Sequence, residues 1–286
     1  MPALRGGRAL ALAVGAAAFL AALKGAAAWW TGSLALFSAS LDSVVDLFVS
    51  SANYIVLRRS RNPPDSDHAY GHGKFEDLAA LGQALMLGAG AIVIVVAAVR
   101  RVGSGVTPRD TTLGIAVLVV AMAIGIGVGR LLSRAGHASE SPVLNADAAH
   151  YLSDAWINGG ALGALLLVRF TGFSLADPLV ALLVAAVILR TAGILGLEAL
   201  GTLSDRTLPE EEVERIRTVL DSFRPRVAGF HDLRTRRAGS QRFIEIHVEI
   251  PRASSFEEAH GLTVEIIEAL GDEFPKSRIF VHPDPV

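Results

Sequence analysis

The sequence predicts a membrane-embedded, all-α bundle of six helices followed by a small α+β domain. Two observations predict this fold class. Of the 286 residues, 51% are hydrophobic and only 19% are charged, whereas soluble domains hold nearer 25% charged residues. The charges are also unevenly divided, because residues 1–208 carry 28 of them and the much shorter stretch 209–286 carries 26. We therefore expect a transmembrane domain over residues 1–206 and a soluble domain over residues 207–286.

Six apolar segments in the first part are each long enough to cross a bilayer, whose hydrocarbon core needs about 20 apolar residues. They are residues 9–30, 34–57, 78–99, 111–129, 143–168 and 178–200. The third and fourth segments contain no charged side chain, and isolated ionisable residues interrupt the others. The first segment is too long for a cleaved signal peptide, and Trp29 and Trp30 at its end suit the aromatic belt of a membrane interface.

The lysines and arginines of the short loops favour cytoplasmic chain ends. With the N-terminus inside, the inner loops hold eight of these residues and the outer loops hold four, and cytoplasmic loops are the ones enriched in basic residues. The inner set is Arg5, Arg8, Arg58, Arg59, Arg61, Lys74, Arg130 and Arg134, and the outer set is Arg100, Arg101, Arg109 and Arg169. We therefore expect both termini in the cytoplasm.

The soluble part predicts the order helix, strand, strand, helix, strand. A helix is expected over 209–222, with Pro209 in its first turn and three glutamates at its positive end. Residues 230–236 and 242–250 alternate apolar and polar side chains as half-buried strands do, with a turn at 238–240. A second helix over 255–271 and a strand over 278–281 complete a small α+β sandwich. A domain of this size is marginally stable alone, so a metal or a second copy would stabilise it.

The composition excludes several classes of function. The chain has no cysteine, which rules out a disulfide scaffold, a thiolate zinc cluster, an iron–sulfur site and a cysteine nucleophile. Its net charge of −2 provides no overall positive field for nucleic acid. The sequence has no phosphate-binding loop ending in Lys-Ser or Lys-Thr, so we expect no ATP-driven step.

Two pairs of ionisable residues inside apolar segments predict a metal site in the membrane. Asp42 and Asp46 share one face of the second helix, and His150 and Asp154 share one face of the fifth, because each pair has i, i+4 spacing. A carboxylate at the centre of a bilayer costs about 2.5–3.5 kcal/mol on insertion scales. Three oxygens and one nitrogen form a tetrahedral set that suits zinc rather than calcium or magnesium. The alternative is a polar helix interface without a metal.

Two further clusters carry potential ligands. Asp65, His68 and His72 lie in one expected cytoplasmic loop and could hold one cation, with Gly71 allowing the backbone to fold around it; a solvated polar loop is the alternative. The soluble part holds five more candidates, which suit a two-metal site of imidazoles and carboxylates, and scattered surface histidines are the alternative. These five are His231, His247, His260, His282 and Asp284.

Several long stretches together resemble the cation diffusion facilitator family, and within it the bacterial zinc and iron efflux antiporters. The resemblance covers essentially the whole chain. The segments that carry it are WWTGSLALFSASLDSVVD, HAYGHGKFEDLAAL, DAAHYLSDAWINGGAL, LSDRTLP, HDLRTRRAG, FIEIHVEI and VHPDP.

The resemblance implies a homodimer of six transmembrane helices and a cytoplasmic, ferredoxin-like (metallochaperone-like) domain, in a bacterial cytoplasmic membrane. It implies a proton-coupled antiporter, not an enzyme, that exports zinc, and also cadmium or iron(II), by alternating access. Zinc would also be structural or regulatory, and no organic cofactor is implied. The implied transport site is Asp42, Asp46, His150 and Asp154, the loop site is Asp65, His68 and His72, and the binuclear cytoplasmic site is His231, His247, His260, His282 and a bridging Asp284. Lys74 and Asp205 resemble members of a charge interlock that holds the membrane and cytoplasmic parts of the dimer together.

Other functions fit the residues less well. A membrane-anchored metal sensor without transport would explain the soluble histidines but not the ionisable pairs in two apolar segments. An intramembrane metalloprotease would need a His-Glu-x-x-His helix and an open metal position, and the sequence contains no such motif. A passive channel would conduct without a proton gradient. Among metals, the ligand types argue against manganese and do not separate zinc from iron(II) or cadmium.

Overall fold

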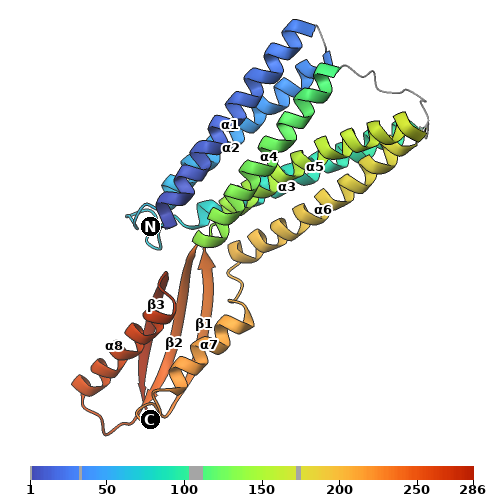
Figure 1. Ribbon diagram of the computed structural model, residues 1–286. Helices are drawn as coiled ribbons and strands as arrows, with labels where there is room; N and C mark the ends of the chain where they lie inside the picture. The colour runs from blue at the N-terminus through green and yellow to red at the C-terminus, as the bar shows by residue number, and fades with distance from the viewer. Residues whose placement is uncertain (1, 32–33, 103–111, 172–174) are drawn as a thin grey trace. The chain divides into compact units, whose positions relative to one another are not determined.

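The computed structural model describes residues 2–31, 34–102, 112–171 and 175–286 (Figure 1). The chain divides into two units, Met1–Ala199 and Leu200–Val286, and each is described by itself below.

The first unit is built from long helices. Over the described residues they are α1 (Pro2–Thr31), α2 (Leu34–Ser60), α3 (Lys74–Val102), α4 (Thr112–Ser139), α5 (Pro142–Thr171) and most of α6 (Ala176–Leu203). Within the described part of the chain, five of these are long and apolar enough to cross a membrane, and α5, which carries polar residues in its first half, is not among the five. Helix α1 packs against α2 and α4, while α5 packs against α4 and α3 (Figure 1). The predicted membrane bundle is confirmed.

Glycines let α4 approach α5 closely. A Cβ atom at Gly129 would lie 2.8 Å from Leu152 Cγ, and one at Gly125 would lie 3.1 Å from the carbonyl oxygen of Tyr151. Small residues at such positions allow the backbones of membrane helices to come together and gain van der Waals contact. The two helices therefore form the most closely packed pair of this unit.

The helices extend beyond the apolar segments, and this corrects one expectation. Most of the basic residues expected in loops lie in helices instead: Arg5 and Arg8 in α1, Arg58 and Arg59 in α2, Lys74, Arg100 and Arg101 in α3, Arg130 and Arg134 in α4, and Arg169 in α5. The reason is that a charged residue ends an apolar run without ending a helix, since arginine is a good helix former. Arg109, expected in an outer loop, and residue 111, the expected start of the fourth segment, lie outside the described residues.

The second unit has the predicted element order. It contains α7 (Glu210–Asp221), β1 (Gly229–Ala238), β2 (Gln241–Ile250), α8 (Phe256–Glu273) and β3 (Ser277–Pro285). The sheet order is β1-β2-β3, with β2 antiparallel to β1 and parallel to β3. Pro209 is the N-cap of α7 rather than a residue of its first turn. Strand β3 is longer than predicted, because proline at a strand edge is tolerated although it interrupts the alternating pattern.

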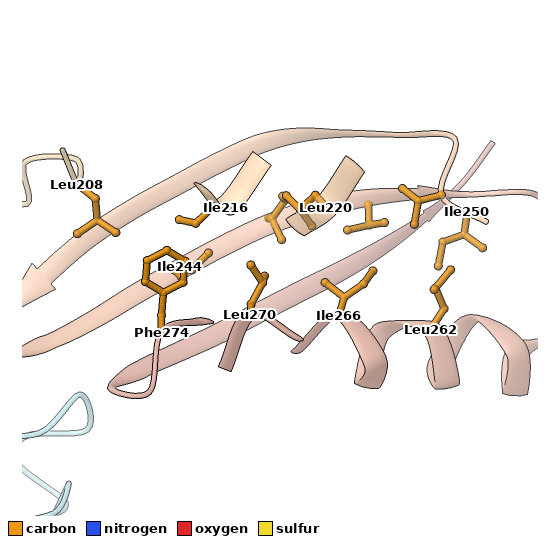
Figure 2. Packing of buried hydrophobic residues seen from close by; sticks show 12 residues of the cluster. Leu208, Ile216, Leu220, Ile244, Ile250, Leu262, Ile266, Leu270 and Phe274 are labelled. Carbon is orange, nitrogen blue, oxygen red and sulfur yellow. The ribbon is translucent and has the colours of Figure 1, made fainter. Parts of the chain in front are cut away.

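One face of the sheet packs against both helices (Figure 2). Ile244, Ile246, Val248 and Ile250 of β2 lie in a buried cluster with residues of α7 and α8, such as Ile216 and Ile266. Successive side chains of a strand point to opposite faces, so Glu245, His247 and Glu249 lie on the other face, away from the helices. That second face is free to carry polar chemistry.

Three candidate metal sites

The membrane unit brings three of the four predicted transport-site residues together. His150 Nε2 lies 3.0 Å from Asp46 Oδ1 and 3.7 Å from Asp154 Oδ2. One ligand atom from each of the three residues lies within 4.8 Å of the others. Asp42, the fourth predicted ligand, is one turn from Asp46 on α2 with an exposed side chain, and the structure does not place it in this group.

The spacing of the three ligand atoms suits a small divalent cation. Zn–N and Zn–O bonds of about 2.0–2.2 Å in a tetrahedron place neighbouring ligand atoms about 3.3–3.6 Å apart. The two distances from His150 Nε2, 3.0 and 3.7 Å, bracket that range. The group therefore needs only small side-chain movements to surround one ion.

Helices α2 and α5, which carry the ligand group, share further polar contacts that the sequence analysis did not predict. One turn beyond Asp46 toward the end of α2, the hydroxyl groups of Ser50 of α2 and Tyr151 of α5 are 3.2 Å apart. One turn further, Asn53 Nδ2 donates to Asp147 Oδ1 over 2.9 Å, and Gln83 Nε2 of α3 donates to the same oxygen over 3.3 Å. Asp147 is fully buried. The seven-residue spacing from Asp46 to Asn53 was the signal that both side chains share one helix face.

The loop between α2 and α3 brings Asp65, His68 and His72 together. Asp65 Oδ1 lies 3.3 Å from His68 Nδ1, and Asp65 Oδ2 lies 3.2 Å from His72 Nε2. The backbone N–H groups of Asp67 and His68 also donate to Asp65 Oδ1, and the bond from His68 lowers the pKa of Asp65 below its ordinary value. Gly71 has a φ of 89°, a left-handed conformation that favours glycine.

The donors of this loop fit a metal ion. His72 is buried, and its Nδ1 has no hydrogen-bond partner among the described residues. The carboxylate of Asp65 remains charged at neutral pH, and the imidazoles of His68 and His72 supply nitrogen donors on either side of it. Imidazole and carboxylate are the ligand types that zinc accepts when thiolates are absent.

In the second unit a row of three histidines crosses the exposed face of the sheet. His247 of the central strand is in register with His231 of β1 and with His282 of β3. Asp284 lies among them, with Oδ2 2.9 Å from His247 Nδ1 and 3.2 Å from His231 Nε2, and with Oδ1 3.3 Å from His282 Nε2. The hydrogen bond with His247 lowers the pKa of Asp284 below its ordinary value.

One ligand atom each of His231, His247 and Asp284 lies within 4.8 Å of the others, so these three could hold one metal ion. His260, the fifth predicted ligand, lies exposed on α8, where its ring stacks on Phe256 at 6.3 Å, and the described protomer does not bring it to the row. Glu249 was not predicted, although its Oε1 lies 3.3 Å from His231 Nδ1. Its partner in the register is Gly229, where a Cβ atom would lie 2.5 Å from Glu249 Oε2.

The two residues predicted to form a charge interlock lie in different units. Lys74 is the first residue of α3. Asp205 follows the end of α6 in a left-handed conformation and pairs with Arg236 over 3.3 Å. The charge interlock stays a prediction.

Comparisons with known proteins match both units. Residues 10–204 match the family described as the cation efflux transmembrane domain. Residues 208–286 match the cation efflux protein cytoplasmic domain, the ZT_dimer family. The cation-efflux pump FieF of Yersinia pestis (strain Pestoides F) is 40% identical over 262 residues, which cover 90% of this chain and 86% of that protein.

Two solved structures resemble the second unit in sequence. A structure of CzrB is 44% identical and covers 28% of this chain and 98% of that chain, with a TM-score of 0.27. The metal-bound C-terminal domain of the CzcD transporter from Thermotoga maritima is 30% identical and covers 27% of this chain and 94% of that chain, with a TM-score of 0.25.

Proposed function

Because this chain belongs to the cation efflux family, the cation diffusion facilitators that its motifs resemble, we propose that it exports divalent transition-metal cations in exchange for protons. Zinc is the preferred substrate in this proposal, with cadmium and iron(II) as further substrates. The observation that carries the proposal is the group formed by Asp46, His150 and Asp154, contributed by two helices of the membrane unit. Asp42 is proposed as the fourth ligand, which joins when the cation binds.

Competition between the cation and protons would couple the two fluxes. A cation binds the deprotonated forms of carboxylates and imidazole, so its binding releases protons and its departure requires them. His150 is the proposed proton carrier, because imidazole changes charge near neutral pH. Each proton that enters along the membrane potential contributes about 2.3 kcal/mol per 100 mV. No chemical bond is made or broken in this cycle, and the protein is not an enzyme in this proposal.

The other two groups are proposed to hold resident zinc. His231, His247, His282 and Asp284 would hold it on the sheet of the second unit, with His260 supplied by a rearrangement or a second copy. There it would join three strands and neutralise Asp284. Asp65, His68 and His72 would hold it in the loop. Membership of the ZT_dimer family supports a homodimer that this zinc stabilises.

The proposed location is the cytoplasmic membrane of a bacterium, with both termini inside. The apolar helices support a membrane protein, and the excess of lysine and arginine in the expected inner loops supports the orientation. In that orientation the metal groups of the loop and of the second unit face the cytoplasm, where they could respond to the zinc concentration.

The test is zinc flux into proteoliposomes with and without an imposed pH gradient, alongside cadmium, iron(II) and manganese. The proposal expects zinc and cadmium flux that the gradient drives, with protons moving in the opposite direction. Equal flux with and without the pH gradient would indicate a passive channel. Metal binding without flux of any cation would favour the alternative, a membrane-anchored metal sensor.

A further inference from the structure

A groove on the membrane unit has a lining of unusual chemical pattern. Residues of α4, α5 and α6 enclose about 590 Å³, and all of them are apolar or glycine except Arg130. The α5 residues of the lining run from Leu152 to Gly163, a length of about 16 Å at the helical rise of 1.5 Å per residue. The groove is therefore elongated, apolar and marked by one positive charge.

Arg130 lies at one end of this groove. Its neighbour Gly129 packs against Leu152, whereas Met122, two turns earlier on α4, lies beside Gly159. Helices α4 and α5 thus run in opposite directions along the groove, and the charge lies at the Leu152 end. Arg130 is exposed, and it has no acidic or hydrogen-bonding partner among the described residues.

The position of Arg130 within a span makes an anionic partner favourable. Helix α4 is apolar enough to cross a membrane from Ile115 to Ser139, and Arg130 lies in the second half of that span, just after its charge-free stretch, where an arginine without a partner is still unfavourable. A guanidinium group binds a phosphate through two parallel hydrogen bonds. The apolar groove beside Arg130 suits a hydrocarbon chain.

We propose that the groove binds one phospholipid with a net negative headgroup, its phosphate on Arg130 and one acyl chain along α5. The chain would lie against Trp156 and the glycines of α5 and reach toward Val184 of α6, which line the groove. A phospholipid fits this groove because its negative headgroup would meet Arg130 at one end and its acyl chain would meet the apolar lining along the rest.

The lipid would act on α5 without touching the metal ligands. At 3.6 residues per turn, Leu152 and Gly159 lie on the face of α5 opposite to His150 and Asp154. An acyl chain between α5 and α6 would therefore support the back of the helix that carries two of the ligands. The proposal does not depend on which cation is carried.

The test measures lipid retention by the full-length protein. The protein is exchanged into micelles that contain phosphatidylglycerol or, separately, phosphatidylcholine, and bound lipid per protomer is counted by native mass spectrometry. The Arg130→Gln variant is expected to retain phosphatidylglycerol about tenfold less, the effect of losing one charge-assisted hydrogen-bond partner. Arg130→Lys should keep most of the preference for phosphatidylglycerol over phosphatidylcholine.

A second variant fills the groove. A Cβ atom at Gly163 has no described atom within 4 Å, so Gly163→Leu can fold while its side chain occupies the acyl-chain space, and it should reduce the retention of both lipids. Arg190→Gln and Gly193→Leu are matched controls on α6, outside the lining, and they should retain lipid like the unmodified protein. Equal retention by Arg130→Gln and the unmodified protein would overturn the proposal. So would loss of the dimer in Gly163→Leu with phosphatidylglycerol still bound, since a second copy would then fill the groove.

Discussion

His150 Nε2 lies 3.0 Å from Asp46 Oδ1, so that a single polar contact joins α5 to α2 at the level of the candidate transport site. The two helices have few other close backbone contacts with each other. A cation that replaced this contact would therefore bind the two helices together directly.

Replacing Asp46 by asparagine should abolish transport. The amide keeps the shape of the side chain and removes the negative charge, and we expect zinc affinity at this site to fall about 100-fold or more, since loss of even an outer group costs 10–100-fold. Zinc flux into proteoliposomes and equilibrium binding check this. The control is Asp67→Asn, an exposed loop carboxylate outside the three groups. Flux at the unmodified rate in Asp46→Asn would refute the assignment.

Two replacements of Asp147 should distinguish its role as a hydrogen-bond acceptor from the effect of its charge. Asp147→Leu leaves the amide donors of Asn53 and Gln83 without their acceptor, and an unsatisfied buried donor costs about 1–3 kcal/mol. Asp147→Asn keeps an oxygen at the same place and should destabilise less. Thermal unfolding in detergent compares the two variants. A leucine variant as stable as the unmodified protein would show that this contact contributes nothing.

Enlarging Gly129 should disrupt the packing of α4 against α5. A side chain there meets Leu152 at 2.8 Å and the carbonyl oxygen of Ala148 at 3.3 Å, whereas a Cβ atom at Gly127 has no described atom within 4 Å. We expect Gly129→Val to lower the unfolding temperature by several degrees, as a destabilisation of about 1–3 kcal/mol from overpacking does. Gly127→Val should leave it within a degree or two. Equal unfolding temperatures would contradict the close approach.

Zinc occupancy of the second unit should fall as the pH falls, because protons compete with zinc for the imidazole nitrogens. Each imidazole must be neutral to bind. Asp284 keeps its charge to lower pH, because the hydrogen bond with His247 lowers its pKa. Zinc content of the full-length Asp46→Asn protein, measured against pH, checks this.

Two variants distinguish the members of that group. His247→Ala removes the central imidazole of the row and should reduce zinc content at pH 7, whereas His260→Ala should reduce it less, since His260 lies exposed on α8. Zinc content in His260→Ala equal to that of the unmodified protein would show that α8 supplies no ligand and would contradict the proposed role of His260.

Glu212 should make the free energy of unfolding of the second unit depend on pH in the acidic range. It accepts hydrogen bonds from Arg237 of β1 and Arg242 of β2, each over 2.6 Å. Burial alone would raise its pKa, but the hydrogen bonds and charges of the two arginines outweigh burial and lower the pKa of Glu212. A lowered folded-state pKa contributes stability above the ordinary value, near 4.3, that is lost as the pH falls through the folded value.

Urea unfolding of residues 200–286, followed by circular dichroism, measures this effect. Glu212→Gln should lower the unfolding free energy at pH 7, and the difference from the unmodified domain should shrink toward pH 3. Glu214→Gln is the control, because Glu214 pairs with Arg217 of its own helix on an exposed face and such pairs contribute little. A difference that does not change with pH would exclude an ionic role for Glu212.

The fold was predictable because run length and period determine its elements. The apolar segments are each long enough for a span, and alternation along 242–250 identified β2. The continuation of α4 through Arg130 was not predictable from hydropathy, which measures the affinity of side chains for lipid rather than the continuity of the backbone. The role of Glu249 depends on the register that places it opposite Gly229, and spacing along one strand does not specify which residues lie across from it.

The separation of Asp42 from the other ligands has the same kind of cause. Two residues four positions apart share a helix face, but whether both reach one point depends on the angle between that helix and its neighbour. The i, i+4 rule therefore predicted the face that the four residues share and could not predict which three would meet.

The side chains along the line where α2 meets α5 become more buried from Asp42 toward Leu57. Asp42 is exposed, the side chain of His150 is 14% exposed and Asp147 is fully buried. Beyond Asp147, Leu57 and Leu144 are 1% and 0% exposed. The protein therefore covers the ligand group more completely on the side on which α2 ends than on the side on which α2 begins. Exposing the ligand group on the side on which α2 ends would require Leu57 and Leu144 to separate, and exposing their buried apolar surface costs free energy.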